Sequence, residues 1–192
     1  MINVGAYYLR EATGTAGLEQ TARTAVSRLA DHHIPHLIVG GLAVQEHGYP
    51  RVTVDVDIVV PDVIEAVEYL TADLAGPFVR VRGCEDTVRD QGNEVLIKLL
   101  PAGHVLKAGC KVPFPEPQNV SEQPTFVSLE ELISLKLDSW FNTPVRRLKD
   151  RTDVIELIAR RRLARELVLQ PAVQALYEDT WDALRAEELG AR

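Results

Sequence analysis

Two glycines and two aspartates are the residues of this chain with the clearest potential for chemistry. Gly40 and Gly41 end a short apolar run, and Asp55 and Asp57 follow, two residues apart, in an apolar segment. Side chains alternate across a β-strand, so a strand here would place both carboxylates on one face. Like charges ~6 to 7 Å apart along a strand are unfavourable unless water, a cation or basic groups neutralise them. The acid pair therefore predicts a site for a divalent cation.

Magnesium suits such a pair by its chemistry. Mg2+ takes oxygen ligands, commonly one or two carboxylates, with water and substrate phosphate at the remaining positions. Glycine at a strand-to-helix turn lets the backbone approach a ligand closely, and the unpaired N–H groups at a helix start suit a triphosphate. The stretch thus predicts phosphate chemistry, with Asp55 and Asp57 as metal ligands and Gly40 and Gly41 beside the phosphate groups.

Arg51 and Thr53 precede the acid pair at the same two-residue spacing. If the strand extends back to them, all four side chains border one surface. We expect Arg51 and Thr53 to lie at the same phosphate-binding site. Arg51 could contact phosphate there, or it could balance the charge of the aspartates.

The ordered combination in GGLAVQEHGYPRVTVDVDIVV resembles a known family. Its glycine pair, Arg-x-Thr and Asp-x-Asp are similar to the signature of the nucleotidyltransferase superfamily, which includes DNA polymerase beta. The wording is closer still to small bacterial proteins related to the nucleotidyltransferase toxins of type IV abortive-infection systems. The resemblance implies an α/β (α+β) fold, with a small mixed β-sheet of nucleotidyltransferase type covered by helices, and a helical C-terminal part.

The resemblance also implies an activity. A metal-dependent nucleotidyltransferase with Mg2+ as cofactor moves a nucleoside monophosphate from a nucleoside triphosphate onto an acceptor hydroxyl. A tRNA, a protein or a small molecule such as an antibiotic are acceptors that fit. If the chain is the toxin of a toxin-antitoxin system, an antitoxin protein is a further partner.

Three more site residues are carried over from the resemblance. The relatives have a lysine in a Leu-Ile-x-x-Lys context that binds phosphate, which corresponds to Lys136, and an aspartate that assists the active site, which corresponds to Asp150 or Asp153. The residues alone allow other roles. A lysine in the middle of a helix is usually exposed, and either aspartate could cap the helix that begins nearby.

Lys98 marks the main departure from the family pattern. Many relatives carry a third carboxylate in a segment like Ile-Asp-Leu-Leu-Pro-Ala-Gly, where this chain has Ile-Lys-Leu-Leu-Pro-Ala-Gly. Lys98 could neutralise the acid pair, contact phosphate, or act as a base if it were buried. Glu94 lies about 13 Å away along the strand, too far to substitute. The alternative function is therefore a catalytically impaired binding protein that keeps the fold.

Charge is unevenly distributed along the chain. The formal net charge of −7 argues against nucleic-acid binding by the whole surface. The segment from Arg146 to Arg165 nevertheless carries eight basic and three acidic side chains. It could bind a polyanion such as tRNA, or it could be a solvated helix face without a partner.

Composition and segment patterns place the chain among ordinary globular proteins. It is 46% hydrophobic and 26% charged, no apolar run approaches the ~20 residues that span a bilayer, and its first 14 residues lack secretory-signal features. We expect a cytoplasmic protein without a membrane partner. Cys84 and Cys110 are accordingly expected to be free thiols.

The predicted organisation has three parts. Residues 1–105 form the nucleotidyltransferase-like core, 106–127 a proline-rich connecting loop, and 128–192 a helical C-terminal part packed on the core. Two helix starts are well marked: Asp62 opens a helix with an apolar stripe that continues to Leu74, and Ser128 opens another with a capping-box pattern.

Overall fold

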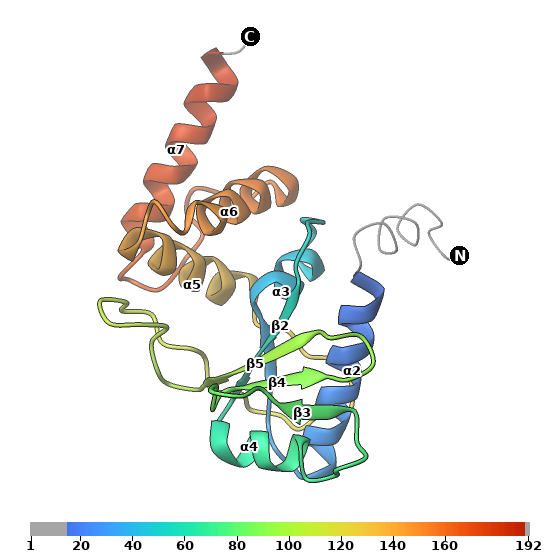
Figure 1. The fold of residues 1–192 in the computed structure, drawn as a ribbon. Coiled ribbons are helices and arrows are strands. Elements are labelled where there is room, and N and C mark those ends of the chain that lie inside the picture. Colours follow the sequence, from blue (N-terminus) through green and yellow to red (C-terminus); the bar gives the residue numbers. More distant parts are fainter. Residues whose placement is uncertain (1–14, 191–192) are drawn as a thin grey trace. The chain divides into compact units, whose positions relative to one another are not determined.

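The computed structural model describes residues 15–190, which form two compact units. The first 14 residues, in which the sequence shows no secretory-signal features, lie outside the described residues. Unit 1 comprises the described residues up to Ala43, Arg51–Ala102 and Pro115–Phe126; unit 2 comprises Val44–Pro50, Gly103–Phe114 and the described residues from Val127 onward. The elements in chain order (Figure 1) are α2 (Thr15–Asp31), β1 (Leu37–Val39), α3 (Gly40–Glu46), β2 (Asp55–Val60), α4 (Val63–Leu70), β3 (Phe78–Arg80), β4 (Thr87–Asp90), β5 (Leu96–Pro101), α5 (Leu129–Asn142), α6 (Leu148–Arg161) and α7 (Gln174–Gly190).

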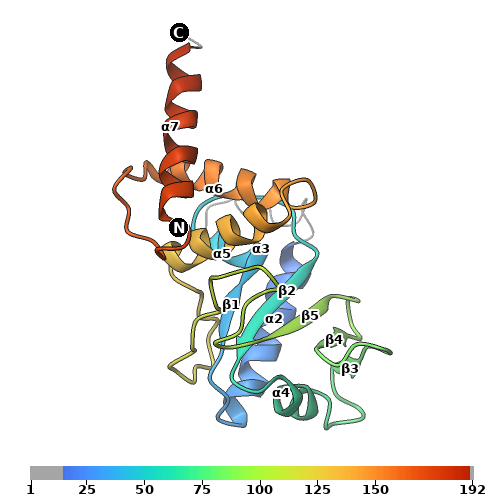
Figure 2. The same cartoon turned by 90° about the vertical axis from the view of Figure 1, so that its left-hand side faces the viewer.

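Unit 1 is built on a five-stranded mixed sheet with the order β1-β2-β5-β4-β3 (Figure 2). The strands β2 and β5 pair in parallel, and the other neighbours pair antiparallel. The acid-bearing strand β2 is therefore an interior strand, held by backbone hydrogen bonds on both sides. The predicted α+β fold with a small mixed sheet covered by helices is confirmed.

The two faces of β2 differ as the alternation predicts. Val56, Ile58 and Val60 are completely buried, and they join the core that α2 and α4 build on one face of the sheet. Asp55 and Asp57 are only partly exposed and leave the strand on the other side. The hydrophobic face thus fixes the register of β2 and, with it, the direction of both carboxylates.

Helix α4 begins as predicted but ends early. The Asp62 side chain accepts a hydrogen bond from the Glu65 N–H, which makes it the N-cap. The helix stops at Leu70 because Thr71 leaves helical geometry, and the Asp73 carboxylate then accepts from the Ala75 N–H in a local turn. The stripe predicted to reach Leu74 was wrong at that residue, whose side chain is 97% exposed.

The strands β4 and β5 pair antiparallel and form a hairpin. Glu94 has a φ of +64° and lies in the turn, and β5 begins only at Leu96. Glu94 forms an ion pair with Arg89. The prediction that Glu94 belongs to the strand was therefore wrong.

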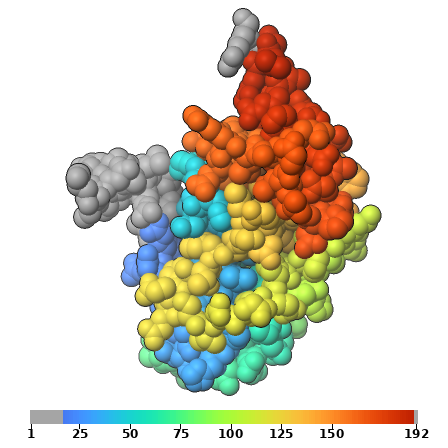
Figure 3. All heavy atoms as spheres, turned by 180° about the vertical axis from the view of Figure 1, so that it is seen from behind, coloured from blue at the N-terminus to red at the C-terminus, as the bar shows by residue number. Residues whose placement is uncertain are grey.

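Residues 115–126 complete unit 1 from a distant part of the sequence. The Ile38 N–H donates to the Thr125 carbonyl, and the Thr125 hydroxyl donates to the His36 carbonyl. Figure 3 shows this returning segment, in yellow, lying over the blue N-terminal part of the same unit. Residues 115–126, which the sequence analysis assigns to a connecting loop, therefore cover β1.

Unit 2 is mainly helical. Ser128 and Glu131 form the predicted capping box at the start of α5, which packs against α6, and α7 contacts both. The loop 103–114 is attached to α5 by Asp138, whose Oδ2 accepts from the Lys111 and Val112 N–H groups. Helix α7 buries Tyr177 and Thr180 near its start, while Leu189 near its end is exposed.

Two further observations within residues 15–190 concern membrane-spanning helices and the cysteines. None of the helices there is both long and apolar enough to cross a membrane. Cys84 and Cys110 are free thiols, as predicted.

Candidate active site

The first part of the site is a close contact between the glycine pair and the acid pair in unit 1. Gly40 follows β1 directly and has a φ of +67°, a conformation that favours glycine. A Cβ atom at Gly40 would overlap Oδ2 of Asp57 and lie 2.9 Å from its Cγ. The Asp57 carboxylate therefore lies on the strand-to-helix turn, and only glycine leaves room for it.

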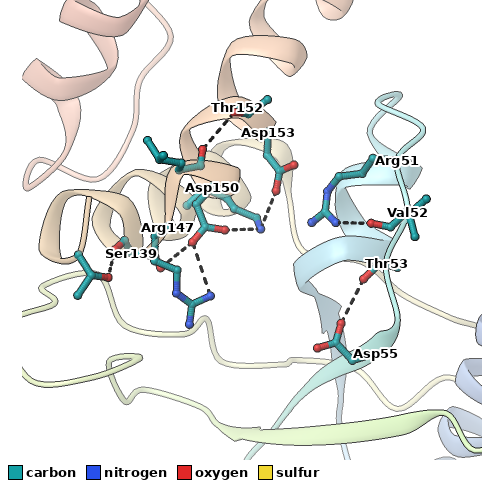
Figure 4. Close-up of polar contacts among 12 residues, drawn as sticks. Arg51, Val52, Thr53, Asp55, Ser139, Arg147, Asp150, Thr152 and Asp153 are labelled. Atoms are coloured by element: carbon teal, nitrogen blue, oxygen red, sulfur yellow. Dashed lines mark hydrogen bonds and ion pairs between the residues drawn. The ribbon is translucent and has the colours of Figure 1, made fainter. Parts of the chain in front are cut away.

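Gly41 has the same relation to Thr53. A Cβ atom at Gly41 would overlap the Thr53 hydroxyl oxygen and lie 2.6 Å from the Thr53 Cβ. Thr53 is only 4% exposed, and its hydroxyl donates to Asp55 Oδ1 over 3.1 Å (Figure 4). Each glycine thus accommodates one side chain of the acidic segment.

Arg51 and Thr53 precede β2, which begins at Asp55. Both are nevertheless part of the segment that leads into the acid pair. The Arg51 guanidinium donates to the Val52 carbonyl over 2.9 Å, so its head group folds back on its own backbone (Figure 4).

Lys98 stands beside Asp57 on the same sheet face. The two residues are paired in register across β2 and β5, and Lys98 is in turn paired with Thr87 of β4. The Lys98 side chain is 47% exposed, and its Nζ lies 3.9 Å from Asp86 Oδ2. Asp86 was missed in the sequence because it lies outside the strands and follows no period. Lys98 is thus a solvent-accessible cation adjacent to the acid pair.

The acid pair fits a magnesium ion by its donor set. Asp55 and Asp57 offer carboxylate oxygens on a partly exposed sheet face, and Mg2+ is typically held by one or two carboxylates with water or phosphate completing the shell. Within residues 15–190, no group of three or more His, Cys, Asp or Glu side chains is placed to hold a metal ion. A cation here would therefore depend on substrate phosphate or water for its remaining ligands.

The other predicted site residues meet in unit 2. Lys136 Nζ lies 2.8 Å from Asp150 Oδ1 and 2.9 Å from Asp153 Oδ2, and Ser139 donates to Asp150 Oδ2 over 2.8 Å (Figure 4). Arg147 reaches Asp150 Oδ2 at 3.8 Å. Because Lys136, Asp150 and Asp153 are all at most 9% exposed, this is a buried ionic cluster that joins α5 to α6.

The cluster corrects two interpretations of the sequence. The residues alone favour an exposed lysine at mid-helix, but Lys136 is buried and faces two carboxylates. Neither aspartate is the helix cap, because the N-cap position of α6 is Arg147, which makes no side-chain capping bond. Ser139, which the sequence reasoning missed, lies three residues after Lys136 and so on the same helix face, a spacing that could have indicated it.

The basic segment from Arg146 to Arg165 is partly neutralised within unit 2. Arg160 pairs with Glu156 and stacks on Tyr49, and Arg165 pairs with Asp182. That hydrogen-bonded guanidinium holds the pKa of the Asp182 carboxyl below its usual range. Arg161 and Arg162, at the end of α6, are exposed.

Comparisons with known proteins give only distant likenesses. No protein-family model and no curated protein matches the chain. The solution structure of the antibiotic-resistance factor ANT(2'')-Ia has a TM-score of 0.48 at 15% identity, covering 90% of this chain and 99% of that one. The crystal structure of ANT(2'')-Ia in complex with adenylyl-2''-tobramycin has a TM-score of 0.46 at 15% identity, covering 85% and 94%. The crystal structure of JHP933 from Helicobacter pylori has a TM-score of 0.33 at 10% identity, covering 92% and 97%. Likenesses of this size decide nothing about the activity of this chain.

Proposed function

We propose that the chain is a nucleotidyltransferase that moves a nucleoside monophosphate from a nucleoside triphosphate onto an acceptor hydroxyl. The observation that carries the proposal is the contact of Asp57 with Gly40, together with the contact of Thr53 with Gly41. These contacts place the acid pair directly at the strand-to-helix turn. Carboxylates for a cation and a turn without side chains for a phosphate chain are then neighbours, as phosphoryl chemistry requires.

The residues of unit 1 would share the work as follows. Asp55 and Asp57 would hold Mg2+, which when bound neutralises charge on the phosphates and orients them. Gly40 and Gly41 would let the backbone lie close to the nucleotide. Lys98, half-exposed beside Asp57, would bind a phosphate oxygen and offset the charge of the leaving pyrophosphate. Most of the rate gain in such reactions comes from alignment and charge stabilisation.

Lys136, Asp150 and Asp153 remain predicted catalytic residues through the resemblance alone. In unit 2 the Lys136 ammonium is hydrogen-bonded to Asp150 and ion-paired with both aspartates. A role in phosphate binding would therefore require these acids to release it. Arg51, with Thr53, remains a predicted nucleotide contact.

Loss of the second aspartate tests the proposal. Asp57→Asn keeps the shape that contacts Gly40 but halves the anionic charge of the pair. We expect transfer of labelled NMP from the preferred of the four NTPs to fall by at least about 100-fold, and magnesium-dependent nucleotide binding to weaken. Asp31→Asn, the same change at an exposed position at the end of α2, should leave both unchanged.

Nucleotide binding and transfer by the wild-type protein distinguish an active nucleotidyltransferase from a catalytically impaired binding protein. If purified wild-type protein shows neither magnesium-dependent binding nor transfer with any of the four NTPs, the nucleotidyltransferase proposal fails. Binding without transfer to tRNA, protein or small-molecule acceptors such as aminoglycosides would instead favour the catalytically impaired binding protein.

A tRNA acceptor would use the basic segment of unit 2. Reversing the exposed charges with Arg161→Glu and Arg162→Glu should weaken tRNA binding and lower the slope of log affinity against log salt by roughly one per lost phosphate contact. Arg80→Glu combined with Arg82→Glu, an equal charge change at two exposed positions of unit 1, is the matched control. Unchanged binding in the double variant would reject tRNA as a ligand of this segment.

A toxin role, with an antitoxin as partner, follows from the resemblance and has its own test. Induced expression of the wild-type chain should arrest growth of a bacterial host, and Asp57→Asn should not. Equal growth with both chains would refute the toxin role and leave the transfer activity to be judged separately.

A further inference from the structure

Thr53 is one of the buried polar residues of unit 1 and lies next to the acid pair in the sequence. Its side chain is 4% exposed although it lies in the irregular segment before β2. A buried hydroxyl is costly unless it is hydrogen-bonded, and this one donates to Asp55 Oδ1 over 3.1 Å. A hydroxyl has one proton to donate. Since Asp55 receives it, Thr53 cannot donate to a phosphate at the same time.

The strand-to-helix turn also packs against the Thr53 side chain. The space where Gly41 would carry a Cβ is taken by the Thr53 hydroxyl oxygen and Cβ. Threonine is branched at Cβ and therefore has few χ1 choices. The Thr53 side chain is thus restrained by its packing against Gly41 and by its hydrogen bond to Asp55.

We infer that Thr53 is a positioning residue that orients the Asp55 carboxylate toward the cation, an inference that rests on the proposed function. Thr53 donates to one oxygen of Asp55, which restrains the rotation of the carboxylate and leaves Oδ2 outside that hydrogen bond. Asp57 is positioned without a second side chain, because its own Oδ2 packs directly against Gly40. The two glycines thus locate the two acids by different routes, one by direct contact and one through a threonine.

The experiment separates orientation of a metal ligand from contact with the nucleotide. Mn2+ serves as the probe, titrated by electron paramagnetic resonance in the presence of a non-hydrolysable analogue of the NTP that the wild type binds. Affinity for the same analogue in EDTA is measured by calorimetry. Thr53→Val removes the hydroxyl and keeps the branched shape, while Thr53→Ser keeps the donor.

We expect Thr53→Val to raise the Mn2+ dissociation constant by roughly 10- to 100-fold, as is typical when a partner of a metal ligand is lost. Thr53→Ser should stay within about threefold of the wild type, because the hydrogen bond to Asp55 can still form. Affinity for the analogue in EDTA should be the same in all three proteins. Thermal melting of each variant checks that the fold is intact.

Gly41→Ala provides an independent variant that leaves both Thr53 and Asp55 chemically unchanged. The added methyl group would displace the Thr53 side chain, so Mn2+ affinity should fall as it does in Thr53→Val. Equal Mn2+ affinity in wild type and Thr53→Val would overturn the inference and leave the proposed function standing. Parallel loss of metal-free analogue binding would also overturn it, since Thr53 would then contact the nucleotide. A wild type that binds no Mn2+ would overturn the proposed function itself.

Discussion

Replacing Lys136 by methionine should destabilise unit 2 strongly. Methionine has a similar length but no charge, so the variant removes the ammonium and keeps most of the volume. Asp150 and Asp153 then face each other without the group that lies 2.8 and 2.9 Å from them. Both carboxylates are buried, with side chains 8% and 1% exposed. Water therefore cannot replace the lost partner without opening the α5–α6 contact.

The magnitude follows from this burial. Removing one partner of a buried ion pair costs about 3–5 kcal/mol, whereas exposed pairs contribute about 0–1 kcal/mol. Arg147, 3.8 Å from Asp150, can offset part of the charge on that residue. Adding Asp153→Asn to Lys136→Met removes one of the two negative charges that the Lys136 ammonium balances. We expect the double variant to recover roughly 2 kcal/mol of the loss.

Urea unfolding monitored by tryptophan fluorescence is the assay. Both tryptophans of the chain, Trp140 and Trp181, belong to unit 2, so the signal reports this unit. Lys111→Met is the matched control, because Lys111 is exposed and the change should cost at most about 0.5 kcal/mol. A loss in Lys136→Met no larger than in Lys111→Met, or a double variant no more stable than the single one, would refute the reasoning.

Three further predictions concern single contacts. Gly40→Ala and Gly83→Ala both place alanine at a positive φ, which costs roughly 1–2 kcal/mol, but only at Gly40 would the methyl group displace a carboxylate. Binding of Mn2+ should therefore fall in Gly40→Ala alone. An equal fall in both variants would contradict the proposed metal site. Ser128→Ala removes the capping box of α5 and should lower the free energy of unfolding by about 0.5–2 kcal/mol in the urea assay, and an unchanged free energy would contradict this role of the cap. Burial raises the pKa of Tyr177 to about 12, above its ordinary value of 10.0, so unfolding releases its proton and stability should decline as pH rises from 10 to 12; Tyr177→Phe should flatten this decline, and an unchanged slope would exclude Tyr177 as its source.

Local patterns were sufficient for the parts of the fold that neighbouring residues decide. The two-residue period of β2 gave the common face of Asp55 and Asp57, and the cap patterns gave the starts of α4 and α5. The end of α4 was not predictable in this way, because the apolar stripe continues to Leu74 after the local turn at Asp73 has taken the chain out of the helix.

Side-chain burial was harder to predict, because it depends on partners far along the chain. Lys136 has the sequence context of an exposed helical lysine, and its burial follows from two acids on the next helix. The sequence likewise showed Thr53 at the right spacing for the acid face but not its place over Gly41. Such contacts are set by tertiary packing, which single-residue periodicity does not contain.

The return of residues 115–126 to β1 bears on how the protein is made. The strand β1 lies at the sheet edge, where its N–H and C=O groups would pair with any strand of another molecule. The Ile38 N–H can donate to the Thr125 carbonyl only after Thr125 has been synthesised and has left the ribosome. In a nascent chain, or in a recombinant fragment that ends at residue 105, β1 is therefore an uncovered edge strand next to the glycine turn. Such a fragment should aggregate more readily than one extended to residue 126.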